Sequence, residues 1–352
     1  MKMQLFNEAI ELLKQLIAIP SFSKEEDKTA DLIQSFFQNK GISTQRKGNN
    51  VWVKNLHFDA SKPTILLNSH HDTVKPNVGY IKDPFFPEVK DGKLYGLGSN
   101  DAGASLVSLM VCFLHFSHAP DLKYNLILAA TAEEEISGKN GVESILEELG
   151  DIDFAIVGEP TLLDLAIAEK GLMVLDCVAI GKSGHAARNE GENAIYKAMK
   201  DIEWFRTYAF DEVSKTLGPV RMSVTMINAG QQHNVVPDEC KFVVDVRSTD
   251  CYSNTQILEI IRAHVKSKVE PRSTRLNPSS IPMDHPIVQA GIALGGKTYG
   301  SPTMSDQALM PYPSLKLGVG DSARSHTADE FVFIHEIEEG IEFYIQLLKQ
   351  VL

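Results

Sequence analysis

The 352-residue chain lacks the sequence features of several large protein classes. It has only four cysteines and no Cys-x-x-Cys pair, which disfavours both a disulfide framework and a thiolate metal site. No window approaches the roughly 18–20 consecutive apolar residues that cross a bilayer. The net charge is −12 at pH 7, whereas nucleic acids and anionic membranes attract basic surfaces. We therefore expect neither nucleic acid nor a membrane as a partner.

Motifs for phosphate binding and for serine catalysis are also missing. Gly96-Leu97-Gly98 has two glycines of a dinucleotide-binding loop, but position 101, where the third would stand, is an aspartate. The chain contains no P-loop and no Gly-x-Ser-x-Gly elbow. Near the N-terminus, Glu8 and Glu11 interrupt the apolar residues, which argues against a signal peptide and favours an amphipathic helix. With so few cysteines, this predicts a cytoplasmic protein.

What is present is the pattern of an α/β protein large enough for two domains. The chain is 43% hydrophobic and 23% charged, which is ordinary for a globular protein. Short apolar runs typical of buried strands alternate with helical patterns. The alternation predicts a mostly parallel sheet with helices on both faces. The main runs are Ile65–Leu67, Leu126–Ala130, Phe154–Val157 and Leu315–Val319.

Three helices of this domain have recognisable sequence signals. Ser23 and Glu26 have the spacing of a capping box, which predicts a helix that opens there and continues to about Lys40. A long apolar helix is expected from Ala102 to about Phe116, and a last helix over residues 335–352.

Residues from about Leu172 to Thr274 follow a different pattern. Apolar and polar residues alternate in Cys240–Arg247, as in a half-exposed antiparallel strand. The order strand-helix-strand-strand-helix, with a last strand near Lys268–Arg272, predicts an inserted ferredoxin-like domain. The expected domains are therefore an insert at 172–274 and a discontinuous main domain at 1–171 and 275–352.

Histidine and carboxylate side chains follow four of the predicted strands. Ligands of parallel α/β sheets bind beyond the carboxyl ends of the strands, so these side chains should meet there. Taken singly, Asp101 is more typical of a helix N-cap, and Glu133–Glu135 of a solvated turn. Taken together, five nitrogen and oxygen ligands can hold two divalent metals roughly 3.5–4 Å apart with a carboxylate between them. The expected ligands are His70, Asp101, Glu135, Glu159 and His326.

The chain resembles the M20 family of di-metal aminoacylases and peptidases, specifically its acetylornithine deacetylase and succinyl-diaminopimelate desuccinylase branch. The matching segments span nearly the whole chain: SHHDTV at 69–74, LYGLGSND at 94–101, TAEEE at 131–135, VGEPT at 157–161, GKSGHAARNEGENAI at 181–195, NVVPDECKFVVDVR at 234–247 and SHTADE at 325–330. The resemblance implies that His70 and Glu159 bind one metal, that Glu135 and His326 bind the other, and that Asp101 bridges them. Two Zn²⁺ ions are expected, with Co²⁺ as the alternative.

The resemblance also implies roles for residues outside the ligand set. Asp72 would orient the His70 ligand and Glu134 would be the general base. The insert would be a lid and dimerisation domain of a homodimer, whose His185 reaches the partner subunit's active site. Asn234 and Arg247 would contact the substrate carboxylate. The peptide bond after Asp101 is expected to be cis, and His71 should face away from the metals.

The function implied is hydrolysis of a small-molecule N-acyl amino acid, with N2-acetylornithine, or an acetylcitrulline or succinylated relative, as the favoured substrate in arginine biosynthesis. The alternatives within the enzyme class are a succinyl-diaminopimelate desuccinylase and a dipeptidase. The alternative from another class is a catalytically silent binding protein of the same fold. The presence of Glu134 together with all five ligands argues against the silent protein. The chain departs from the family at Leu97, at Ala102-Gly103 and at Glu133, none of them an expected ligand.

Overall fold

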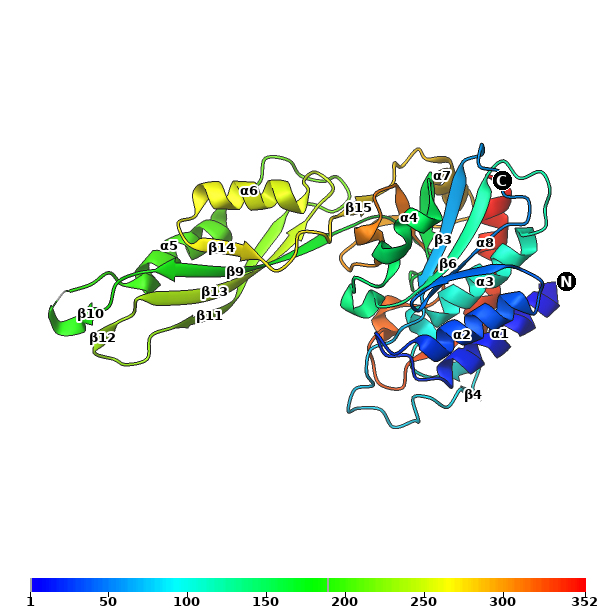
Figure 1. Cartoon of the computed structure of the whole chain (residues 1–352), viewed down its shortest axis with the longest axis horizontal. Coiled ribbons are helices and arrows are strands. Elements are labelled where there is room, and N and C mark those ends of the chain that lie inside the picture. The colour runs from blue at the N-terminus through cyan, green and yellow to red at the C-terminus, as the bar shows by residue number, and fades with distance from the viewer. Residues whose placement is uncertain (1, 189) are drawn as a thin grey trace. The chain divides into compact units, whose positions relative to one another are not determined.

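The computed structural model describes residues 2–188 and 190–352, which divide into two compact units (Figure 1). Unit 1 comprises the chain up to Ile167 together with Ser280–Tyr299 and Ser305–Leu352. Unit 2 comprises Ala168–Ser279 and Gly300–Met304, a little more of the chain than the predicted insert. Within the described residues, no helix has the length and apolar character needed to cross a bilayer.

The main sheet has nine strands in the described part of the chain, in the order β1-β2-β6-β3-β7-β17-β8-β15, with β16 paired to β8. Its centre, β6-β3-β7-β17, is parallel, and β1, β2 and β8 are antiparallel to their neighbours. The prediction of a mostly parallel α/β sheet is therefore confirmed. The strands are β1 (Thr44–Lys47), β2 (Asn50–Lys54), β3 (Thr64–His70), β6 (Asn125–Thr131), β7 (Phe154–Val157), β8 (Leu165–Glu169), β15 (Ser279–Ser280), β16 (Thr298–Ser301) and β17 (Ser314–Lys316).

Apolar side chains on both faces of the sheet explain why β3 is buried along its whole length. Ile65 and Leu67 pack into a core with α1 (Lys2–Ile17), α3 (Ala104–Phe116) and α8 (Ile334–Lys349), which also contact one another (Figure 1). Leu66 points to the other face, because successive side chains of a strand alternate. There it packs in a second core that includes residues of the 3-10 turn η3 (Val142–Ile145) and of α4 (Leu146–Leu149). The helix α7 (Pro286–Ala293) adds Ile287 and Val288 to the first core.

Two helix starts differ from the prediction. The capping box is wrong: α2 runs over Asp27–Gln38 with Glu26 as its N-cap, and the side chain of Glu26 does not cap it. Instead, the Ser23 hydroxyl donates a hydrogen bond to the Asp72 carboxylate at 2.7 Å. The helix α3 begins at Ala104, since residues 99–103 form a separate π-helical turn, η1, in which Asp101 and Ala102 have non-helical dihedrals.

A small antiparallel sheet brings the C-terminal loop to the start of η1. It pairs β18 (Phe331–Phe333) with β5 (Lys93–Tyr95), and β5 with β4 (Glu88–Lys90). Phe331 lies opposite Tyr95, so the residues just before β18 are placed beside those just after β5.

Unit 2 contains a four-stranded antiparallel sheet in the order β11-β13-β9-β14, and its main strands and helices follow one another along the chain in the predicted ferredoxin-like order. Its strands are β9 (Gly171–Ile180), β11 (Arg221–Ala229), β13 (Glu239–Ser248) and β14 (Lys268–Pro271). The helices α5 (Ala194–Thr207) and α6 (Asn254–His264) share one apolar core with a single face of this sheet. A short pair, β10 (Gly184–His185) with β12 (Val235–Val236), completes the unit.

Candidate metal centre

The five expected ligands meet at the carboxyl ends of the parallel strands of unit 1. His70 is the last residue of β3, and Glu159 follows β7 by two residues. They form two groups whose ligand atoms lie within 4.8 Å of one another: one contains His70, Asp101 and Glu159, the other Asp101, Glu135 and His326. Asp101 belongs to both groups, which is the position that a bridging carboxylate needs.

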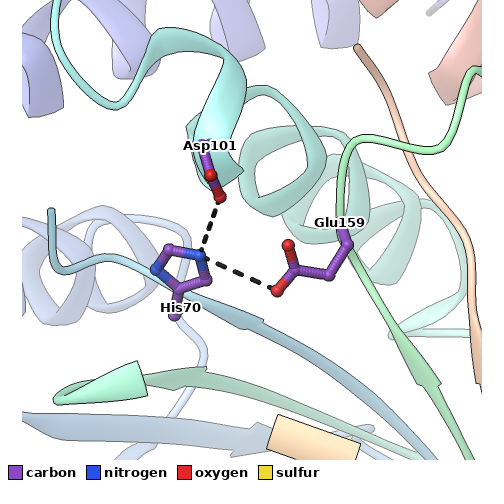
Figure 2. Close-up of side chains that lie close together, drawn as sticks. All are labelled: His70, Asp101 and Glu159. Atoms are coloured by element: carbon purple, nitrogen blue, oxygen red, sulfur yellow. Dashed lines mark hydrogen bonds and ion pairs between the residues drawn. The ribbon is translucent and has the colours of Figure 1, made fainter. Parts of the chain in front are cut away.

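Each carboxylate oxygen of Asp101 lies near a different histidine. His70 Nε2 lies 3.3 Å from Asp101 Oδ1 and 3.7 Å from Glu159 Oε1, and Figure 2 shows the imidazole directed at both carboxylates. His326 Nε2 lies 3.7 Å from Asp101 Oδ2 and 2.9 Å from Glu135 Oε2. Two cations could therefore be bound side by side, with one aspartate between them.

The donor set fits divalent metals in a second respect. Glu159 Oε1 is buried and has no hydrogen-bond partner within the described chain. An unsatisfied buried carboxylate oxygen is costly, and a bound cation would satisfy it. The five ligands are imidazole nitrogens and carboxylate oxygens, which suit Zn²⁺ and Co²⁺.

The pKa values of the ligands in the metal-free protein are shifted by burial and by their neighbours. Burial would lower the pKa of His70, but the carboxylates of Glu134, Asp101, Asp72 and Glu159 raise it well above its usual value. The hydrogen bond to Glu135 raises the pKa of His326 to about 9, and burial raises that of Glu159 to about 8. Because metal ligands must be deprotonated, metal binding here would release protons.

Asp72 connects one ligand to the loop that carries another. His70 Nδ1 is 3.0 Å from the Asp72 backbone oxygen and 3.4 Å from its carboxylate. The same carboxylate accepts hydrogen bonds from the backbone N–H groups of Glu134 and Glu135, at 3.1 and 3.2 Å. Asp72 therefore holds the His70 ring with Nε2 toward the centre and fixes the start of η2 (Glu134–Ile136).

Glu134 is placed beside both groups without belonging to either. Its Oε2 lies 3.9 Å from His70 Nε2. Burial raises the pKa of the Glu134 carboxyl well above its usual value.

His71 points away from the cluster, as its place between two site residues predicted. Its Nδ1 lies 2.9 Å from Thr29 Oγ1, and its Nε2 lies 2.9 Å from the Asn49 backbone oxygen. Burial lowers the pKa of His71 to about 4, so the ring is neutral at physiological pH. The Asp101–Ala102 peptide bond is cis, as the resemblance implied.

Four polar residues around the centre were missed by the sequence analysis. Ser23 binds Asp72, as described above, and the buried Glu26 accepts from the backbone N–H of Glu133 at 3.2 Å. Asp306, in η5 (Asp306–Leu309), accepts a 2.6 Å hydrogen bond from the Thr131 hydroxyl at the end of β6. Glu330 lies in the SHTADE segment that was singled out for His326, which was the one available signal for it.

Comparison with known proteins agrees with this geometry. Residues 66–350 match the family model described as peptidase family M20/M25/M40. The chain belongs to this family. Among curated relatives, succinyl-diaminopimelate desuccinylase from Wolbachia pipientis subsp. Culex pipiens is 28% identical over 267 residues. This alignment covers 71% of this chain and 66% of the relative, so the chain spans just under two thirds of the length of that relative. Acetylornithine deacetylase from Proteus mirabilis is 29% identical over 373 residues, 97% of this chain and 96% of the relative.

Solved structures show the same fold. Aminopeptidase PepT from Bacillus cereus superposes with a TM-score of 0.76 at 18% identity, over 100% of this chain and 99% of the other. The Bacillus subtilis YXEP protein, described as a dinuclear metal-binding M20 peptidase, superposes with a TM-score of 0.71 at 16% identity, over 98% of each chain.

The remaining predicted M20 site residues lie in unit 2. His185 is in β10, and the N–H of Ala186 donates to the Asn234 backbone oxygen at 3.1 Å, so His185 and Asn234 are neighbours. Arg247 is near the other end of β13 and forms two hydrogen bonds with Asp245, at 2.8 and 3.1 Å. The strand β13 begins at Glu239, five residues after Asn234, and Arg247 lies roughly 26 Å further along it at about 3.3 Å per residue. Within one chain, Asn234 and Arg247 therefore do not meet, and their roles toward a substrate stay predictions.

Proposed function

We propose that this protein hydrolyses the amide bond of an N-acyl amino acid with two divalent metal ions, and that N2-acetylornithine is its substrate in arginine biosynthesis. The observation that carries the chemistry is the placement of Asp101, with one carboxylate oxygen toward each histidine and Glu134 beside them. The deacetylase relative aligns over nearly the whole of both chains, which supports the acetylated substrate. An acetylcitrulline or succinylated relative would suit the same site.

Five residues would hold the metals: His70 and Glu159 one ion, Glu135 and His326 the other, and Asp101 both. When bound, such ions lower the pKa of a shared water and polarise the amide carbonyl. Zn²⁺ is the ion that we favour, and Co²⁺ has the same ligand preferences.

The side chains of this protein would then carry the protons. Glu134 would accept the proton of the attacking water and return it to the leaving amine, which cannot depart as an anion. Asp72 keeps His70 Nδ1 engaged, so that Nε2 faces the centre. His185 of the second subunit would donate to the oxyanion that develops on the carbonyl oxygen.

Recognition of the substrate carboxylate would fall to basic residues of unit 2. Burial lowers the pKa of Lys170, and the positive charges of Arg221 and Arg247 lower it further. Lys170, Arg221 and Arg247 place three positive charges in this part of unit 2, one of them paired with Asp245, and positive charges favour binding of an anionic group. This supports the role proposed for Arg247.

A homodimer through unit 2 is supported by the surface of that unit. The strand β11 is an edge of its sheet, and Met226 and Ile227 in it are 60% and 55% exposed. On α5, Tyr196 and Met199 are 67% and 57% exposed. Unpaired edge strands and exposed apolar side chains are typical of surfaces that bind another chain.

A panel of substrates tests the proposal. Purified protein, stripped of metal and reloaded with Zn²⁺, would be assayed for release of free amine from N2-acetylornithine, N2-acetylcitrulline, succinyl-diaminopimelate and a dipeptide, with the Glu134→Ala variant as control. We expect the highest kcat/KM with N2-acetylornithine. The second candidate is desuccinylation, because several relatives carry the name succinyl-diaminopimelate desuccinylase. A preference for the succinylated compound would select it, and no release from any compound by metal-loaded protein would favour the silent binding protein.

A further inference from the structure

Glu330 is a buried carboxylate that holds the backbone around the bridging aspartate. Its side chain is 2% exposed. Its Oε1 accepts hydrogen bonds from the N–H groups of Asn100, at 2.8 Å, and of Asp101, at 2.9 Å. Its Oε2 accepts one from the N–H of Gly98, at 3.2 Å, and its backbone oxygen accepts one from Gly96, at 3.0 Å. A single residue therefore binds the segment from 96 to 101 at four points.

Two more hydrogen bonds connect this segment to the loop that contains Glu330. Asn100 Nδ2 donates to the Asp321 backbone oxygen at 3.1 Å, and the Asp321 N–H donates to Asn100 Oδ1 at 3.0 Å. In the sequence, His326 lies between Asp321 and Glu330, four residues before Glu330. The His326 side chain is 56% exposed, so its position depends on its loop more than on packing around the ring.

We propose that Glu330 is a positioning residue that sets the separation between Asp101 and His326, and that it thereby forms the metal site made by Asp101, Glu135 and His326. The other site depends on Glu330 less. His70 ends β3 and Glu159 follows β7, and these two strands are hydrogen-bonded to each other in the main sheet. The inference rests on the proposed di-metal function.

A carboxylate is suited to this role in a way that an amide is not. Its two oxygens together accept three backbone N–H groups, those of Gly98, Asn100 and Asp101. Glutamine offers one acceptor oxygen, and its NH₂ group would face a backbone N–H. Aspartate keeps the two oxygens, but it is one methylene shorter and cannot reach all three donors.

Metal titration of the metal-free protein tests the role without any measurement of activity. Wild-type protein, Glu330→Gln and Glu330→Asp would be titrated with Zn²⁺ and, for its absorption spectrum, with Co²⁺, and bound metal would be counted after dialysis. Removing such a supporting partner typically weakens metal binding about 10–100-fold. We expect both variants to weaken the second equivalent of metal to this extent and to leave the first nearly unchanged.

Asp201→Asn is the matched control. Asp201 is 6% exposed and accepts hydrogen bonds from the backbone N–H groups of Lys266 and Ser267 at 3.2 and 2.8 Å, but it belongs to unit 2. We expect this variant to lower the Tm and to bind both metals with wild-type affinity.

Two results would overturn the inference. The first is wild-type affinity for both metals in Glu330→Gln. The second is wild-type affinity in Glu330→Asp, because the reach of the side chain to the three N–H groups would then not matter. If Glu330→Gln does not fold, the aspartate variant decides. Wild-type protein that binds fewer than two metals would contradict the proposed function itself.

Discussion

Replacing Asp306 by asparagine should stabilise the metal-free protein at neutral pH. Asp306 is 3% exposed, and burial raises the pKa of its carboxyl from 3.8 to about 6, although the Thr131 hydroxyl donates a hydrogen bond to it. The folded protein therefore holds this proton more tightly than the unfolded chain does. Asparagine has nearly the shape of the protonated acid, can accept the Thr131 hydrogen bond and cannot ionise.

The size of the effect follows from the two pKa values. Because the pKa is higher in the folded state, stability is lost as the pH rises from 3.8 through about 6. A shift of about two units corresponds to about 3 kcal/mol above pH 7 and to about 1 kcal/mol at pH 4.5. The variant avoids this cost, so its advantage over the wild type should grow with pH across this window.

The assay must report unit 1 alone, because a protein of two units need not unfold in one transition. The chain has two tryptophans, Trp52 in unit 1 and Trp204 in unit 2. Urea unfolding of EDTA-treated protein, followed by Trp52 fluorescence in a Trp204→Phe background, gives the free energy of unfolding of unit 1 from pH 4.5 to 8. No gain in stability at pH 8, or an equal gain at both ends of the range, would refute the reasoning.

Three further predictions concern the chemistry. Glu134→Ala should retain both metals, measured by elemental analysis, because Glu134 is not an expected ligand, and it should lose turnover, because the proposed base is gone. An active variant would remove Glu134 as the base. His185→Ala should lower kcat by roughly 10²–10³, the usual cost of one oxyanion donor, with unchanged metal content, and an unchanged kcat would contradict its role. Removal of metal with EDTA should abolish activity and lower the Tm, because the metals bind only the folded protein. Addition of Zn²⁺ should restore both the activity and the Tm. Full activity in EDTA would exclude the mechanism.

The elements that the sequence predicted best are those whose pattern is local. The run Ile65–Leu67 with its polar end predicted β3, because a buried parallel strand is apolar on both faces. The alternation of apolar and polar residues in Cys240–Arg247 predicted β13, in which buried and more exposed side chains alternate. The convergence of four of the five ligands followed from one rule, that the carboxyl ends of parallel strands share an edge; Asp101 lies in η1, after a strand of the small antiparallel sheet.

The residues that the sequence missed act through contacts distant in the chain. Ser23 and Asp72 are 49 residues apart, and Glu330 and Asp101 are 229 residues apart. The Ser23–Glu26 spacing fits a capping box equally well, and only the folded protein shows that both side chains bind other partners. Nothing around Asp306 in the sequence distinguishes it from a loop aspartate, because its environment is made by the ends of β3 and β6.

The spread of the ligands along the chain also bears on the order in which the protein is made. His70, Asp101 and Glu159 have all been synthesised before unit 2 begins, whereas His326 comes roughly 170 residues after Glu159, and all of unit 2 is translated in between. At about 5–20 residues per second, this interval lasts on the order of ten seconds or more. The first group of ligands is thus present in the nascent chain well before the second, and the pair of sites can be completed only after all of unit 2 has been translated.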